Sequence, residues 1–126
     1  MSPQRIQRRR TPGWRMPENA VYVGRPTKWG NPWRLVDETH TDFGPVVAVV
    51  HDDGSRHRGP TAQYTRANGQ WWAARLYGET VVWPNPEMQD AIRRELAGKD
   101  LACWCKPGDP CHADVLLEIA NGGEPR

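Results

Sequence analysis

The sequence predicts a small α/β domain, with a short, mostly parallel sheet flanked by helices and one inserted β-hairpin. Short β-rich runs alternate with helix-forming segments, which is the pattern of an α/β fold. The 126 residues suffice for one domain with one modest core. Only 37% of the residues are hydrophobic, so the seven tryptophans are expected to supply much of the buried area.

The chain divides into a flexible basic arm (residues 1–19), a single α/β domain (20–122) and a short polar tail (123–126). The arm holds three prolines and three consecutive arginines, and it lacks apolar periodicity. Residues 1–28 carry seven arginines and lysines against one acid, which gives +6 and leaves −4 for the remainder of a chain with net charge +2. This basic N-terminal segment favours a nucleic acid or another polyanion as partner. In the alternative, the segment is solvated and binds no partner.

Composition also predicts where the protein works. No apolar run approaches the roughly 20 residues of a membrane span, so no membrane association is expected. No apolar segment follows the basic N-terminus, which argues against a secretory signal. The three cysteines are an odd number and do not suggest a disulfide framework. Together these features predict a protein of the reducing cytoplasm.

The first half of the chain reads as strands joined by irregular loops. Strands are predicted over residues 20–23, 34–36 and 46–50. The loop at 24–33 contains two prolines and two glycines, which exclude regular structure there. After the third strand, Asp53 and Gly54 favour a tight turn that leads into a return strand at 56–58, and this pair is the inserted hairpin.

Three helices are predicted in the second half, over residues 62–77, 86–97 and 110–121. Thr61 is the expected N-cap of the first helix, and Gly78 is its expected end. The second helix has Asn85 as N-cap, proline at its first position and an apolar stripe at helical spacing. The third follows a strand at 101–105, with Asp109 as its expected N-cap.

The loop that leaves the first strand is a candidate ligand site. Ligands of open α/β sheets bind where loops leave the carboxyl ends of strands. Arg25 and Lys28 are suited to hold phosphate, Trp29 to stack on a base, and Thr27 and Asn31 to add hydrogen bonds. In the alternative, the loop is rigid, its tryptophans fill the core and its cations are solvated. The spacing of a Walker A phosphate loop is absent.

All three cysteines lie between residues 103 and 111. Cys103 and Cys105 share one face of the predicted strand, since residues two apart point the same way. Cys111 falls in the first turn of the last helix, where free N–H groups stabilise a thiolate. The favoured hypothesis is a reactive or anion-binding site at Cys111, assisted by Lys106 and His112.

Two other hypotheses for the cysteines stay open. In one, Cys103, Cys105, Cys111 and His112 bind zinc, a ligand set that suits a tetrahedral site. Against zinc, the Cys-x-Cys-x5-Cys-His spacing differs from paired Cys-x2-Cys knuckles, and neighbouring Cys and His on a helix diverge by about 100°. In the other, the cysteines are small buried hydrophobes.

The segments Val21–Trp33 and Gly98–Leu116 resemble the family catalogued as domain of unknown function 4326. This small bacterial and phage-borne family has no settled activity, and the resemblance spans residues 20–121. The Cys-His start of the last helix is similar to that of domain of unknown function 488. The resemblance implies a small Rossmann-like α/β fold and a site shared by the two motifs.

We therefore expect the first strand and the 101–105 strand to be neighbours, so that their following loops build one cleft. Its expected ligand-binding residues are Arg25, Thr27, Lys28, Trp29, Asn31, Cys105 and Lys106, and its expected catalytic residues are Cys111 and His112. The expected ligand is a nucleotide or a nucleic-acid base. The alternative is a non-enzymatic zinc or nucleic-acid binding module, so enzyme and binding protein both stay open.

Overall fold

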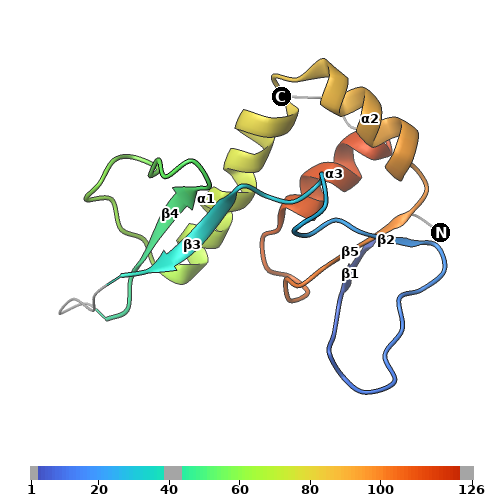
Figure 1. The fold of residues 1–126 in the computed structure, drawn as a ribbon, viewed down its shortest axis with the longest axis horizontal. Helices are drawn as coiled ribbons and strands as arrows, with labels where there is room; N and C mark the ends of the chain where they lie inside the picture. Colours follow the sequence, from blue (N-terminus) through green and yellow to red (C-terminus); the bar gives the residue numbers. More distant parts are fainter. Residues whose placement is uncertain (1–2, 39–43, 123–126) are drawn as a thin grey trace.

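The computed structural model describes residues 3–38 and 44–122 (Figure 1). The predicted tail at 123–126 lies outside these residues. In chain order the elements are β1 (Arg5–Gln7), β2 (Ala20–Tyr22), β3 (Trp33–Asp37), β4 (Val47–His51), α1 (Arg66–Tyr77), the π-helix η1 (Gly78–Val82), α2 (Pro86–Leu96), β5 (Asp100–Cys103) and α3 (His112–Ala120). The predicted mixed α/β content is confirmed.

A parallel sheet of order β1-β5-β2 holds the two ends of the chain together. Arg5 and Val21 both pair with Leu101, one from each side of the central strand. The predicted adjacency of the first strand and the cysteine-bearing strand is therefore confirmed. Leu101, Ala102 and Cys103 are all buried, as expected for a central parallel strand covered on both faces.

The N-terminal segment differs from its prediction. The sequence predicts no strand before residue 20, whereas Arg5–Gln7 forms β1 against the edge of β5. The backbone ladder explains the difference, because Arg8 N–H also donates to Cys103 O at 2.7 Å. A segment of three residues with one apolar side chain is too short to show the alternating pattern of a strand. This strand is therefore apparent only from its pairing with β5.

The antiparallel pair also differs from the predicted hairpin. β4 pairs with β3 along its whole length, and the expected return strand supplies a single bridge, between Val50 and Arg56. Arg58 and Gly59 then take positive φ values of 61° and 94°. Because an extended strand has negative φ, the return strand cannot continue through these two residues.

Helix α1 begins later than predicted, ends at the predicted residue and is followed directly by a π-helix. Thr65, rather than Thr61, is the N-cap, and its side chain accepts a hydrogen bond from Asn68 N. Gly69 lies buried inside the unbroken helix. The α-helix ends at Tyr77 with Gly78 at the C-cap position, as predicted. The expected stop is absent, however, because Gly78 has a helical φ of −60° and ψ of −51° and the chain continues as the π-helix η1.

The two later helices cover the parallel sheet. The predicted start of α2 is confirmed, since the Asn85 side chain accepts from Met88 N. The predicted cap of α3 is wrong: Cys111 occupies the N-cap position, with φ −151° and ψ 146°. Asp109 instead closes the preceding turn, donating its N–H to Lys106 O at 3.1 Å.

The core has two parts. The larger one joins the parallel sheet to α2 and α3, with Ile92, Leu101, Leu116 and Ile119 fully buried at its centre. The smaller one lies between α1 and the β3–β4 pair. Figure 1 shows these two units at opposite ends of the molecule. Among the described residues, none of the helices has the length and apolar character needed to cross a membrane.

Candidate functional site

A cavity of about 370 Å³ lies between the two units of the fold. It opens at the carboxyl ends of β2 and β5, with β3, α1 and the start of α3 as its other walls. Its lining comprises Tyr22, Gly24, Arg25, Asn31, Trp33, Arg34, Leu35, Gln70, Ala73, Ala74, Cys103, Trp104, Cys105, Pro110, Cys111 and His112. The two motifs at the ends of the chain therefore share one cavity.

Six of the predicted site residues line this cavity, namely Arg25, Asn31, Cys103, Cys105, Cys111 and His112. The lining also includes residues that were not predicted to belong to the site. Trp33 and Trp104 lie inside the two motifs, so their position in the sequence was the signal. Gln70 comes from α1, and no local pattern marks it.

The other predicted residues of the first loop face elsewhere. Lys28 Nζ lies 2.7 Å from Glu95 Oε1 on α2, and it also sits 4.8 Å from the Trp29 ring centroid. Trp29 is only 4% exposed and belongs to the core, as the alternative hypothesis for this loop expected. Thr27 Oγ1 donates to Gly24 O at 2.6 Å, inside the loop. Lys106 is likewise absent from the cavity lining.

Asn31 links the loop at residues 24–33 to helix α1 through a hydrogen bond. Its Nδ2 donates to Ala73 O at 3.0 Å, while its Oδ1 accepts from Trp33 N at 2.9 Å. The side chain uses both ends of its amide in these contacts. Asn31 therefore sets the distance between two walls of the cavity.

Two arginines of the cavity share one carboxylate. Arg25 Nη1 lies 2.9 Å and Arg34 Nε 3.7 Å from Asp52 Oδ1. One acid cannot neutralise two guanidinium groups, so this side of the cavity keeps a net positive charge. All three side chains are about half exposed, so the ion pairs themselves add little stability.

His112 is fixed in one orientation. Its side chain is buried, and Nε2 lies 2.8 Å from Val23 O. A carbonyl oxygen only accepts, so Nε2 carries the proton and Nδ1 keeps a lone pair. Nδ1 lies 3.7 Å from Cys111 Sγ. Burial lowers the pKa of His112, which keeps the ring neutral near pH 7.

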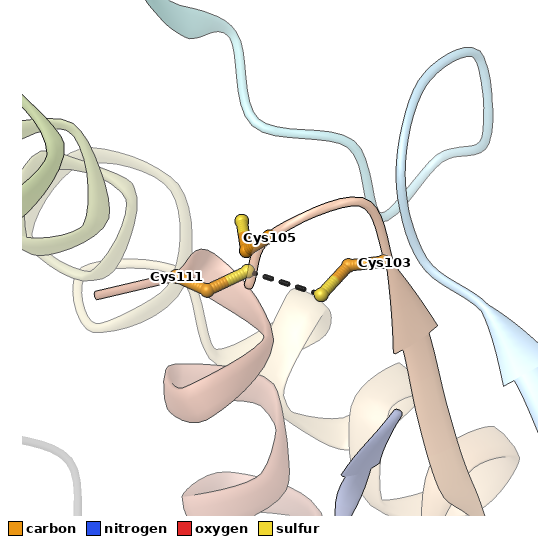
Figure 2. Close-up of side chains that lie close together, drawn as sticks. All are labelled: Cys103, Cys105 and Cys111. Atoms are coloured by element: carbon orange, nitrogen blue, oxygen red, sulfur yellow. Dashed lines mark hydrogen bonds between the residues drawn. The ribbon is translucent and has the colours of Figure 1, made fainter. Parts of the chain in front are cut away.

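The three cysteines are free and their sulfurs gather in one place (Figure 2). All three Sγ atoms lie within 4.8 Å of one another, and Cys111 Sγ is 3.4 Å from Cys103 Sγ. His112, which the zinc hypothesis included, falls outside this group. Cys103 comes from the end of β5, Cys105 from the following turn and Cys111 from the cap of α3.

The negative charge of this cluster falls on Cys103. Hydrogen bonds donated by Cys105 and Cys111 lower the pKa of Cys103 to about 3. The bond that Cys105 donates to Cys103 raises the pKa of Cys105 to about 11, and the pKa of Cys111 is raised for the same reason. The sequence favoured a thiolate on Cys111, whereas these contacts favour one on Cys103.

Arg5 provides the compensating charge from the opposite end of the chain. Its side chain is 11% exposed and donates from Nη1 to Asp109 O at 2.7 Å and from Nη2 to Lys106 O at 3.0 Å. Burial alone would lower the pKa of Arg5, but the charges of Asp114 and the three cysteines raise it. Arg5 therefore belongs to the site, although the sequence assigned it to an arm.

The fold and cavity define a small mixed α/β domain with a thiol cluster at the edge of a three-stranded parallel sheet. The family model of the domain of unknown function DUF4326 matches residues 6–122. The chain therefore belongs to this family, as the resemblance of its two end motifs indicated. The match includes most of β1. No curated protein and no solved structure matches the chain.

Proposed function

We propose that the cavity binds a nucleotide or a nucleic-acid base, in a Rossmann-like arrangement in which the ligand lies at the carboxyl ends of the parallel strands. One observation carries the proposal: guanidinium groups, aromatic rings and thiols line a single cavity of about 370 Å³. That volume is within the range of small-molecule sites, which are mostly apolar with a few converging polar groups.

Charge and shape support this class of ligand. Arg25 and Arg34 exceed the charge of Asp52, so an anionic group such as phosphate would be attracted there. Tyr22, Trp33 and Trp104 offer aromatic surface in the same cavity, and aromatic faces stack on bases. A phosphate beside the arginines would leave the base among these rings.

Any reaction in this cavity would use the Cys111–His112 pair. His112 Nδ1 keeps its lone pair and lies 3.7 Å from Cys111 Sγ, because Nε2 is committed to Val23 O. The Cys111 S–H, which donates to Cys103, would have to turn from Cys103 toward this nitrogen. A histidine held in this way is able to accept the thiol proton, as in cysteine nucleophiles activated by a neighbouring base.

Substitutions of two positively charged residues in the same loop, Arg25 and Lys28, test nucleotide binding. Arg25 lines the cavity, whereas Lys28 contacts Glu95 on α2. With nucleoside monophosphates as probes in isothermal titration calorimetry, Arg25→Ala should weaken binding by about tenfold, which is about 1.4 kcal/mol. Lys28→Ala should bind like the unmodified protein. Equal losses in both variants, or no binding at all, would refute the proposal.

A second candidate function is the binding of single-stranded nucleic acid. Arg8 and Arg10 lie 5.2 and 4.8 Å from the Trp104 ring, which is 41% exposed. A separate groove contains these three residues with Arg9, Trp14 and Met16. Trp104 lines both the groove and the cavity, so a strand on the arginines would have access to the cavity. Arginines interleaved with an exposed aromatic ring are typical of such sites.

Salt dependence tests this second candidate. Binding of a short single-stranded oligonucleotide, followed by fluorescence anisotropy, should weaken steeply as salt rises, since arginines displace counterions from phosphates. Trp104→Ala should cost about 1–3 kcal/mol through lost stacking. Arg94→Ala, an exposed change on α2, removes the same charge away from the groove and is the control. Binding that is insensitive to salt would exclude this function.

A further inference from the structure

We propose that Cys103, Cys105 and Cys111 bind one zinc ion through their sulfurs, with a fourth coordination position open to the cavity. Four zinc ligands at about 2.3 Å from the metal stand about 3.8 Å from one another in a tetrahedral site. The three sulfurs already lie within 4.8 Å of one another, with 3.4 Å between Cys103 and Cys111. Small rotations of the side chains are enough to reach the required spacing.

The backbone on either side of the three cysteines keeps their sulfurs close together. Cys103 ends a central strand and Cys111 caps a helix, so both come from regular elements (Figure 2). Between them, the turn is closed by the bond from Asp109 N to Lys106 O, and Arg5 binds both of these residues through their carbonyl oxygens. The ligands are therefore close together before any metal arrives, which lowers the entropy cost of binding.

Charge balance fits a divalent soft metal. Three thiolates and Zn²⁺ carry a net charge of −1, and the nearly buried Arg5 supplies +1, which it shares with the more exposed Asp114. Without a metal, three thiolates this close would repel one another strongly. Thiolate ligands select zinc over the hard cations, which prefer oxygen.

The fourth position is left to the cavity. His112 is outside the sulfur group, and its Nε2 is held by Val23 O. All three cysteines line the cavity, so a donor atom of a bound ligand or a water molecule has access to the metal from that side. Zinc sites with three protein ligands and one open position are typical of sites where a substrate or water binds. This part of the inference rests on the proposed ligand cavity, whereas metal binding itself does not.

Zinc would also change the role proposed for Cys111. A thiolate bound to the metal is no longer a free nucleophile, so a ligand in the cavity would meet the zinc instead of the Cys111–His112 pair. Metal content therefore decides which chemistry the cavity supports.

Native mass spectrometry of protein purified under reducing conditions without chelator tests the site. We expect one zinc per chain, removed by a strong chelator and restored by added Zn²⁺. Cys105→Ser should weaken zinc binding by at least about a hundredfold, since it removes one of three ligands. Cys105 is the least buried of the three, so this variant should fold even if Cys111→Ser does not. Arg94→Ala should keep its zinc.

Cobalt substitution gives a second readout. Co²⁺ in the chelator-treated protein should show intense sulfur-to-cobalt charge-transfer bands, which weaken in Cys105→Ser. Failure to bind zinc or cobalt in the reduced protein would overturn the inference, and so would unchanged binding by Cys105→Ser. A Cys103–Cys111 disulfide that persists under the same reducing conditions would also overturn it.

The two proposals fail separately. Nucleotide binding by the metal-free protein that depends on Arg25, in the absence of any zinc binding, would reject the metal site alone. Zinc binding without nucleotide affinity would reject the proposed function alone.

Discussion

Arg5 shows how a single side chain ties the two ends of this chain together. It stands in β1, and its guanidinium group binds the turn between Cys105 and Cys111 through two carbonyl oxygens. Its third contact is Asp114 on α3, at 3.2 Å. The planar guanidinium makes these bonds in different directions at once, which an ammonium group does not reproduce.

Arg5→Lys should therefore destabilise the protein. The lysine keeps the charge but loses at least one charge-assisted bond to a carbonyl oxygen, and we expect a loss of about 2 kcal/mol in the free energy of unfolding. Urea denaturation followed by circular dichroism measures it. Arg9→Lys, at an exposed position of the same segment, is the control and should be neutral. A midpoint equal to that of the unmodified protein would contradict the role given to Arg5.

Several individual residues of the candidate site were predictable from the sequence. The predicted residues that lie outside the cavity share one cause. Arg25, Asn31, Cys105 and Cys111 follow predicted strands or begin a predicted helix, and such positions meet at one edge of a sheet. Lys28 lies in the same loop as Arg25, but its ammonium group contacts α2 instead of the cavity. Where a loop side chain points depends on its tertiary neighbours, in this case Glu95.

Gly78, where helix α1 passes into the π-helix η1, packs closely against Trp83. A Cβ atom at this position would come within 2.6 Å of the Trp83 ring, although the backbone φ of −60° suits any residue. The glycine is needed for close packing rather than for a turn. A sequence pattern does not distinguish these two uses of glycine, which explains why the continuation as η1 was not predicted.

Gly78→Ala should lower stability despite the higher helix propensity of alanine. Propensity alone would favour the variant by about 1 kcal/mol. Displacing a rigid aromatic ring costs more, so we expect a net loss of about 1–2 kcal/mol in chemical denaturation. Asn68→Ala, an exposed change in α1, serves as control and should be neutral or slightly stabilising. A stabilised Gly78→Ala protein would mean that Trp83 moves freely.

The whole molecule consists of two units of unequal size around one cavity. Within the described part of the chain, the larger core contains thirteen buried residues and joins the parallel sheet to α2 and α3. The smaller contains three, between α1 and β3–β4. The class of fold and the meeting of the two end motifs were predictable, because they follow from strand and helix patterns. β1 and the β3–β4 pairing were not, because backbone pairing across the chain determines them.

Because the two cores differ in size, the two units should differ in their resistance to local unfolding. Amide hydrogen exchange is expected to be slowest in β5 and at Val23, whose N–H donates to Ala102 O. Amides of β4 should exchange faster through local unfolding of the smaller unit, because fewer buried contacts stabilise that unit. Mass spectrometry or NMR in mild denaturant measures both. Equal protection in β4 and β5 would show that the two units open together.

The order of the parallel sheet also constrains how the chain is made. Among the described strands, its central strand β5 is synthesised last, whereas both of its partners are synthesised first. During synthesis β1 and β2 therefore stay unpaired until β5 has been made, while β3, β4 and α1 are able to associate from nearby residues. Contacts this distant in sequence form slowly, so correct folding should depend on keeping β1 and β2 from pairing elsewhere in the meantime.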